Sequence, residues 1–168
     1  MKTLVLYYSK TGNTKLIAET IAEETKADIL EIQREKDVKS EGGFWLYFTG
    51  GFQSMTKRKD KVKPFDKNLQ EYDLIFLGSP VWAWRINPAI RSLFNDVQFS
   101  DKKFSLFCCC SGKGNGLKVC EATKEYLVGN TVIGETEFID PLLKDTEEQT
   151  NRAKDWAKEM VKEAKKKK

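Results

Sequence analysis

The sequence contains no histidine, and this absence removes several kinds of chemistry at once. No Ser-His-Asp or Cys-His arrangement can form, and no histidine can act as a general base. The four cysteines, at positions 108, 109, 110 and 120, lack the Cys-x-x-Cys spacing of structural zinc sites. We therefore predict no metal site and no catalytic side chain, so that any catalysis would depend on a cofactor.

Long apolar runs are also missing, and none reaches the ~18 residues that a membrane span requires. Met1-Lys2-Thr3 leads directly into a strand pattern, so we expect no signal peptide. Three consecutive cysteines do not suit a disulfide framework and indicate reduced, buried thiols in the cytoplasm.

The net charge is +4, and part of it comes from two basic runs, at 57–63 and 165–168. Either run could contact nucleic acid or an acidic partner. No recognisable nucleic-acid-binding motif accompanies them, so we interpret both as solvated and predict no nucleic-acid partner. With 168 residues, the chain is expected to form one domain over 1–164, followed by a basic tail at 165–168.

Short apolar runs alternate with helical patterns along the chain. Strands are expected at 3–8, 27–33, 72–78, 103–110 and 131–139. Helices are expected at 13–25, behind the Asn87-Pro88 cap, at 116–128, and behind a capping box at Thr146-Glu147-Glu148-Gln149. This alternation predicts an α/β fold, a three-layer, doubly wound, five-stranded parallel sheet with right-handed crossovers.

The loop behind the first strand contains six residues suited to binding a phosphate: Ser9, Lys10, Thr11, Gly12, Asn13 and Thr14. Backbone amides at a helix N-terminus converge there, and the helix dipole favours an anion. Neither the P-loop pattern nor the dinucleotide fingerprint follows this strand, which favours a phosphate monoester. The alternative is an ordinary strand-to-helix turn with hydroxyl capping.

Two further loops should lie at the same edge, because ligands of such sheets bind beyond the carboxyl ends of the strands. The second loop is aromatic and contains Ser79, Pro80, Val81, Trp82, Ala83 and Trp84. The third loop is rich in glycine and contains Ser111, Gly112, Lys113, Gly114 and Asn115. The tryptophans would stack on a flat aromatic ligand. The alternative is a local hydrophobic lid, or burial of one ring in the core.

The six residues from Ser9 to Thr14 resemble the phosphate signature of the flavodoxin family, Ser/Thr-x-Thr-Gly-Asn-Thr. The second loop resembles the flavin loop whose tryptophan, here Trp82, stacks on the ring. The third resembles the loop that closes over the pyrimidine end. The resemblance implies a flavodoxin-like strand order, 2-1-3-4-5, bound FMN as cofactor, and one- or two-electron transfer.

The chain departs from the usual carriers of this family in its charge and in its second loop. The carriers are strongly acidic and often have glycine after the stacking tryptophan, where this chain has Ala83. Here the neighbours are Arg85 and Lys113, and positive charge would stabilise the anionic reduced flavin and raise its potential. An aromatic insert at 42–56 would either pack over the flavin edge, form a partner surface, or bury its rings in a crossover helix.

Three functions remain from the sequence. The first is an FMN-dependent electron carrier that works with redox partner proteins as a monomer or weak dimer. The second is an FMN-dependent NAD(P)H oxidoreductase acting on quinones or similar acceptors, with cations such as Arg85 attracting the nicotinamide donor. The third is a binding module that has lost its flavin, against which the intact first loop argues.

Overall fold

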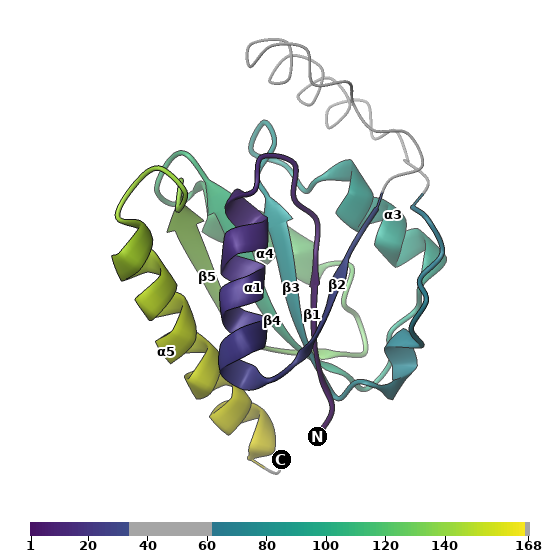
Figure 1. Ribbon diagram of the computed structural model, residues 1–168. Coiled ribbons are helices and arrows are strands. Elements are labelled where there is room, and N and C mark those ends of the chain that lie inside the picture. Colours follow the sequence, from purple (N-terminus) through teal and green to yellow (C-terminus); the bar gives the residue numbers. More distant parts are fainter. Residues whose placement is uncertain (34–61, 167–168) are drawn as a thin grey trace.

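The computed structural model describes residues 1–33 and 62–166, and within these ranges the strands form one parallel sheet (Figure 1). The strand order is β2-β1-β3-β4-β5, as the resemblance implied. The strands are β1 Thr3–Tyr7, β2 Asp28–Glu31, β3 Leu74–Pro80, β4 Lys103–Cys110 and β5 Thr131–Ile139. The prediction of an α/β fold with five parallel strands is confirmed.

Helices cover both faces of the sheet and give the molecule three layers. The described helices are α1 Asn13–Thr25, α3 Pro88–Asp96, α4 Asn115–Lys124 and α5 Thr146–Lys165, with a 3-10 turn, η1, at Leu69–Glu71. One hydrophobic cluster joins the sheet to α1 and α5, and the other joins it to α3 and α4. The aromatic insert at 42–56 lies outside the described residues.

The central strands are apolar on both faces because both faces are covered. Leu74, Ile75, Phe76 and Leu77 of β3 are all buried. The consecutive cysteines follow the two-residue period of a strand, so Cys108 and Cys109 belong to opposite clusters. All four cysteines are described, buried and free, as the sequence predicted.

The capping box predicted at Thr146 is wrong. Asp145, with φ 46°, precedes the first helical residue and forms no side-chain cap. The Thr146 hydroxyl donates to the carbonyl of Pro141 at 2.7 Å. The Gln149 side chain both donates to the carbonyl and accepts from the amide of Ile139, at 2.7 and 2.8 Å. These side chains therefore satisfy backbone groups of β5 and the loop after it, instead of groups within their own helix.

At the other helix ends, one prediction agrees with the structure and one differs from it. Asn87 caps α3 as predicted, since its Oδ1 accepts from the Ala89 amide at 2.8 Å, with Pro88 at the first helical position. The helix predicted at 116–128 is shorter, because α4 ends at Lys124. Leu117, in the first turn of α4, is 40% exposed.

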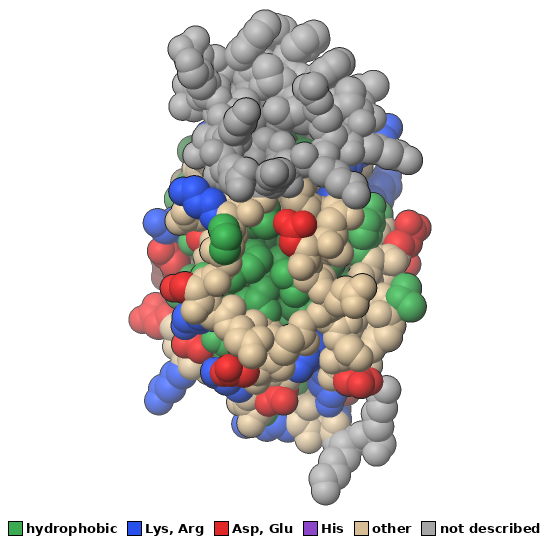
Figure 2. Space-filling view, turned by 90° about the vertical axis from the view of Figure 1, so that its right-hand side faces the viewer, with side chains coloured by type: hydrophobic (Ala, Val, Ile, Leu, Met, Phe, Trp, Pro, Cys, Tyr) green, Lys and Arg blue, Asp and Glu red, His purple; other side chains and the backbone are tan. Residues whose placement is uncertain are grey.

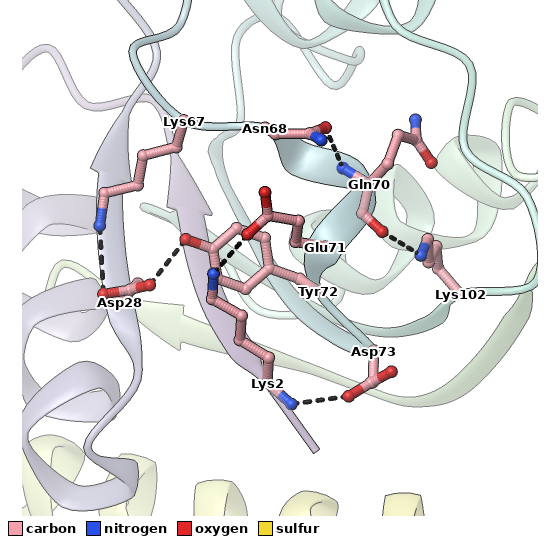
Figure 3. A network of polar contacts seen from close by, with 9 residues as sticks. All are labelled: Lys2, Asp28, Lys67, Asn68, Gln70, Glu71, Tyr72, Asp73 and Lys102. Atoms are coloured by element: carbon pink, nitrogen blue, oxygen red, sulfur yellow. Dashed lines mark hydrogen bonds and ion pairs between the residues drawn. The ribbon is translucent and has the colours of Figure 1, made fainter.

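A polar network holds the amino-terminal edge of the sheet, away from the loops of interest (Figure 3). The Tyr72 hydroxyl donates to Asp28 at 2.6 Å, and Lys67 pairs with the same carboxylate at 3.1 Å. Lys2 pairs with Glu71 at 2.7 Å. The hydrogen bond from Tyr72, followed by that from Lys67, lowers the pKa of Asp28. These contacts fix the edge strand β2 against β1 and η1.

We predict that the free energy of unfolding falls in alkali. Burial raises the pKa of Tyr7 and of Tyr72 to about 12, and that of Cys110 to about 11. In the unfolded chain these groups ionise near ~10 and ~8.5. Their folded pKa values are raised, so stability is full below the unfolded values and is lost as the pH rises toward the folded ones. Urea unfolding from pH 7 to 11 measures this decline, and Tyr72→Phe should make it shallower above pH ~10. A profile that stays flat to pH 11 would contradict it.

The face beside the β2 edge carries hydrophobic side chains gathered near its centre and charged groups around them (Figure 2). Leu30 of β2 and Phe65 are only partly buried against the cluster beneath α3 and α4.

No helix within 1–33 or 62–166 has both the length and the hydropathy of a membrane span.

Candidate functional site

Four strands end side by side at the upper edge of the sheet in Figure 1, and the loops behind them form the candidate site. Backbone hydrogen bonds beyond the strands join these loops in pairs: Tyr8 N to Gly78 O at 3.1 Å, Val81 N to Cys109 O at 2.9 Å, and Asp140 N to Cys110 O at 3.0 Å. The first, second and third predicted loops therefore meet at one edge, together with the loop between β5 and α5.

The first loop is organised by Ser9. Its Oγ accepts hydrogen bonds from the amides of Gly12 and Lys15, both at 3.2 Å. Gly12 precedes α1 with φ 91°, a conformation that side chains disfavour. A Cβ at this position would lie 3.1 Å from the Leu142 side chain. Glycine is therefore required both for the turn and for the close approach of the β5–α5 loop.

Asn13 holds the loop from the other side. Its Nδ2 donates to Thr11 Oγ1 at 3.2 Å, and its Oδ1 accepts from the Leu142 amide at 3.0 Å. Of the four hydroxyl and amide side chains that the sequence offered, Ser9 and Asn13 thus shape the loop. Thr11, which is exposed, and Thr14, which is buried, complete the set.

The N-terminus of α1 is open to an anion. The Lys15 amide bonds to Ser9 and the Leu16 amide to the Gly12 carbonyl, whereas those of Asn13 and Thr14 have no acceptor among the described residues. Thr14 Oγ1 is buried without a hydrogen-bond partner in the described part of the chain. The Cys109 thiol lies close by. Burial raises the pKa of this thiol, and an interaction with the Thr14 hydroxyl lowers it. The neighbour of the hydroxyl is thus a sulfur atom, which is a weak hydrogen-bond acceptor. Unsatisfied donors at a helix N-terminus fit a phosphate.

The N-terminus of α4, by contrast, is filled by a carboxylate of the chain. Glu137 of β5 accepts from the amides of Gly114, Gly116 and Leu117, at 2.5, 2.9 and 3.3 Å. A Cβ at Gly116 would lie 2.6 Å from the Glu137 Cβ, so glycine is needed for this approach. The N-termini of α1 and α4 thus differ: that of α4 is occupied by Glu137, and that of α1 is available to an external anion.

Sequence reasoning missed Glu137. It stands in β5 two residues after Glu135, on the same face, and no motif separates a buried carboxylate from a solvated one there. Its surroundings are polar in other ways. The Cys110 thiol lies 3.8 Å from its Oε2, and Arg152 donates to its backbone carbonyl. Burial, and then the charge of Glu137, raise the pKa of Cys110 to about 11, so this thiol stays protonated at neutral pH.

The second loop turns sharply between Trp82 and Arg85. The Arg85 amide donates to the Trp82 carbonyl at 3.0 Å, and the central residues Ala83 and Trp84 both have positive φ, 47° and 56°. Trp82 is partly buried and packs edge-on against Tyr8, with centroids 5.9 Å apart. Trp84 is 72% exposed. The two predicted stacking rings therefore differ, one resting on the core and one projecting outward.

The strain in this turn gives a prediction for Ala83→Gly. Positive φ costs a residue with a side chain about 1–2 kcal/mol, part of which glycine gives back as chain entropy on folding. We expect Ala83→Gly to raise the free energy of unfolding by about 0.5–1 kcal/mol, measured in urea. Ala122→Gly within α4 is the control and should lower it by about 1 kcal/mol. If Ala83→Gly lowered the free energy of unfolding as much as Ala122→Gly does, positive φ at Ala83 would not be a source of strain.

The remaining predicted residues also lie at this edge. In the third loop Ser111 and Lys113 are exposed, and Gly112, Gly114 and Asn115 are partly buried. Ser79 is buried at the end of β3, with its hydroxyl on the carbonyl of Pro80 at 3.1 Å. Lys10 is partly buried in the first loop. Gly114 was predicted to contact the cofactor, but its amide already donates a hydrogen bond to Glu137.

Comparison with known proteins agrees with this geometry. The family model for flavodoxin matches residues 2–160, so the chain belongs to the flavodoxin family. A structure from Bacteroides eggerthii DSM 20697 superposes with a TM-score of 0.76 at 18% identity, covering 95% of this chain and 98% of that one. At that identity the similarity concerns the fold.

Two further proteins are similar to this chain. A flavoprotein from Lactobacillus acidophilus NCFM, solved in complex with FMN, has a TM-score of 0.67 and 25% identity, covering 86% of this chain and 97% of its own. The flavodoxin-like domain-containing protein BilS of Clostridioides difficile (strain CD3) is 31% identical over 107 residues. That match covers 64% of this chain and 46% of BilS, so the chain spans less than half the length of that relative.

Proposed function

We propose that this protein binds FMN and carries electrons between redox enzymes of the cytoplasm. The observation that carries the proposal is the open N-terminus of α1, with the buried, unpartnered Thr14 hydroxyl beside it. Membership of the flavodoxin family and the FMN complex of the Lactobacillus relative support FMN as the cofactor.

Different residues at this edge would bind the phosphate and the ring of FMN. The amides of Asn13 and Thr14, with the Thr11 and Thr14 hydroxyls, would hold the phosphate, and Ser9 keeps the loop in shape. Trp82, which packs against Tyr8, is the ring that would stack on the flavin. When bound, FMN supplies one- and two-electron chemistry, and the chain binds it, orients it and shields it from water.

The alternative is an FMN-dependent NAD(P)H oxidoreductase acting on quinones or similar acceptors. The exposed cations Arg85 and Lys113 at this edge favour it, because they would attract an anionic nicotinamide donor. The carrier is the better supported among the described residues, since the connections that follow β1, β3, β4 and β5 are short and leave little chain for a substrate pocket: residues 8–12, 81–87, 111–114 and 140–145.

The two functions differ in where the electrons come from. NADH and then NADPH are added without oxygen to the FMN-loaded protein while the flavin absorbance is followed. We expect neither to bleach the flavin within minutes, although dithionite reduces it. Rapid bleaching by either nucleotide would replace the carrier by the reductase.

A further inference from the structure

The three loops of the site, with the helix starts behind them, contain no acidic residue. The segments 9–18, 79–94 and 110–120 have no Asp or Glu and carry six cations: Lys10, Lys15, Arg85, Arg91, Lys113 and Lys118. Helix N-termini normally favour acidic side chains, because the dipole is positive there. The first turns of α1, α3 and α4 have none, whereas that of α5 has Glu147 and Glu148. Helix stability does not explain this bias.

The carboxylates nearest to this edge do not cancel its charge. Glu137 is 9% exposed and is covered by the amides of α4. Asp140 pairs with Lys144 at 3.0 Å. Lys15 pairs with Glu19 at 3.8 Å, but Arg85, Lys113 and Lys118 are exposed and extend the positive charge from the β3 loop to α4. Within the described residues, the part of this edge over β3 and β4 is therefore positive.

An exposed aromatic ring stands within this positive edge. Trp84 is 72% exposed, and its backbone is fixed by the turn that the Arg85 amide closes on the Trp82 carbonyl. A fixed tryptophan followed directly by an exposed arginine has the composition of an interface anchor, since these two residue types are enriched among those that dominate binding. Charge at the rim then steers the encounter.

We propose that this edge docks an acidic surface of a partner protein, with Trp84 as the anchor and Arg85 and Lys118 at the rim. The proposal rests on the proposed carrier function and names its partner by charge. An apolar ring bordered by cations matches the apolar core and charged rim of a protein interface.

The test measures electron transfer from the reduced, FMN-loaded protein to two haem proteins by stopped flow. Cytochrome b5 is the acidic acceptor and cytochrome c the basic one, and each ferric haem takes one electron from the reduced flavin. Because their driving forces differ, the readout is the dependence of each rate on ionic strength. We expect the rate with cytochrome b5 to fall with added salt and the rate with cytochrome c to rise. Two salt-independent rates, or the opposite signs, would overturn the proposal.

Matched charge reversals locate the effect. Arg85→Glu with Lys118→Glu should lower the rate with cytochrome b5 by on the order of tenfold at low salt. Lys162→Glu with Lys165→Glu makes the same change in net charge near the end of α5 and should leave that rate within about twofold. Equal losses in the two double variants would mean that net charge, and not this edge, sets the rate.

Trp84→Ala separates the anchor from the flavin. We expect a lower rate with cytochrome b5, while the dissociation constant of FMN, measured by fluorescence quenching, changes far less than in Trp82→Ala. A loss of FMN affinity equal to that of Trp82→Ala would assign the ring to the flavin and overturn its role as anchor. These rates start from chemically reduced protein, so bleaching by NADH or NADPH would refute the carrier without affecting them.

Discussion

Thr14→Val is expected to weaken FMN binding by roughly 10- to 100-fold and to leave riboflavin binding unchanged. The Thr14 hydroxyl is buried and has no hydrogen-bond partner among the described residues, and it lies at the open N-terminus of α1. A hydrogen bond to a charged group contributes about 1.5–3 kcal/mol, and valine keeps the shape of threonine without the donor. Riboflavin has no phosphate and should not sense the change. Calorimetric titration with both ligands measures the difference.

The same substitution should have the opposite effect on the protein without ligand. A buried hydroxyl without a partner is unfavourable, so Thr14→Val should raise the free energy of unfolding of the apoprotein by about 1 kcal/mol. Thr20→Val on the same helix is the control, because its hydroxyl donates to the Leu16 carbonyl at 2.8 Å, two turns from the loop. That control should leave FMN affinity unchanged. If Thr14→Val weakened the binding of FMN and of riboflavin equally, the phosphate would not bind at this helix.

Glu137→Ala is expected to lower the free energy of unfolding by about 3 kcal/mol, because it leaves buried amides at the start of α4 without an acceptor. The amides of Gly114, Gly116 and Leu117 all bond to this one carboxylate. In a domain of this size the thermal midpoint should fall by roughly 6–12 °C. Differential scanning calorimetry of the apoprotein measures it.

Two other variants identify the cause. Glu137→Gln keeps an acceptor and loses the charge, so its effect should lie between those of wild type and alanine. Glu135→Ala, two residues away on the same strand face, removes a partly exposed ion pair with Lys124 at 2.8 Å and should cost less than about 1 kcal/mol. If Glu137→Ala were no more destabilising than Glu135→Ala, Glu137 would not be the cap of α4.

The fold and the phosphate loop could be predicted because their signals are local. The apolar runs at β1, β3 and β4 and the hydroxyl-rich loop behind β1 are continuous in the sequence. The prediction of a capping box at Thr146 also relied on a local signal, and it was wrong. The box is a local pattern whose side chains instead bond to the end of β5 and the loop behind it, and no local pattern reports such a contact.

Two features of the site depend on contacts between distant residues. Glu137 reaches the start of α4 only after β4 and β5 have paired, and the sequence separation hides this. The positive φ of Ala83 and Trp84 is likewise concealed, since turns of this kind usually contain glycine or asparagine. The sequence shows alanine where the family's carriers often have glycine, yet the backbone at Ala83 adopts positive φ.

Binding of the FMN phosphate at the N-terminus of α1 is the step on which the proposed function depends. A crystal structure of the FMN complex would show the position of the phosphorus atom. We expect the phosphate oxygens to accept from the amides of Asn13 and Thr14 and from Thr14 Oγ1, while Glu137 stays on the amides of α4. A phosphate at the start of α4, with Glu137 displaced, or one bound only by surface lysines, would contradict it.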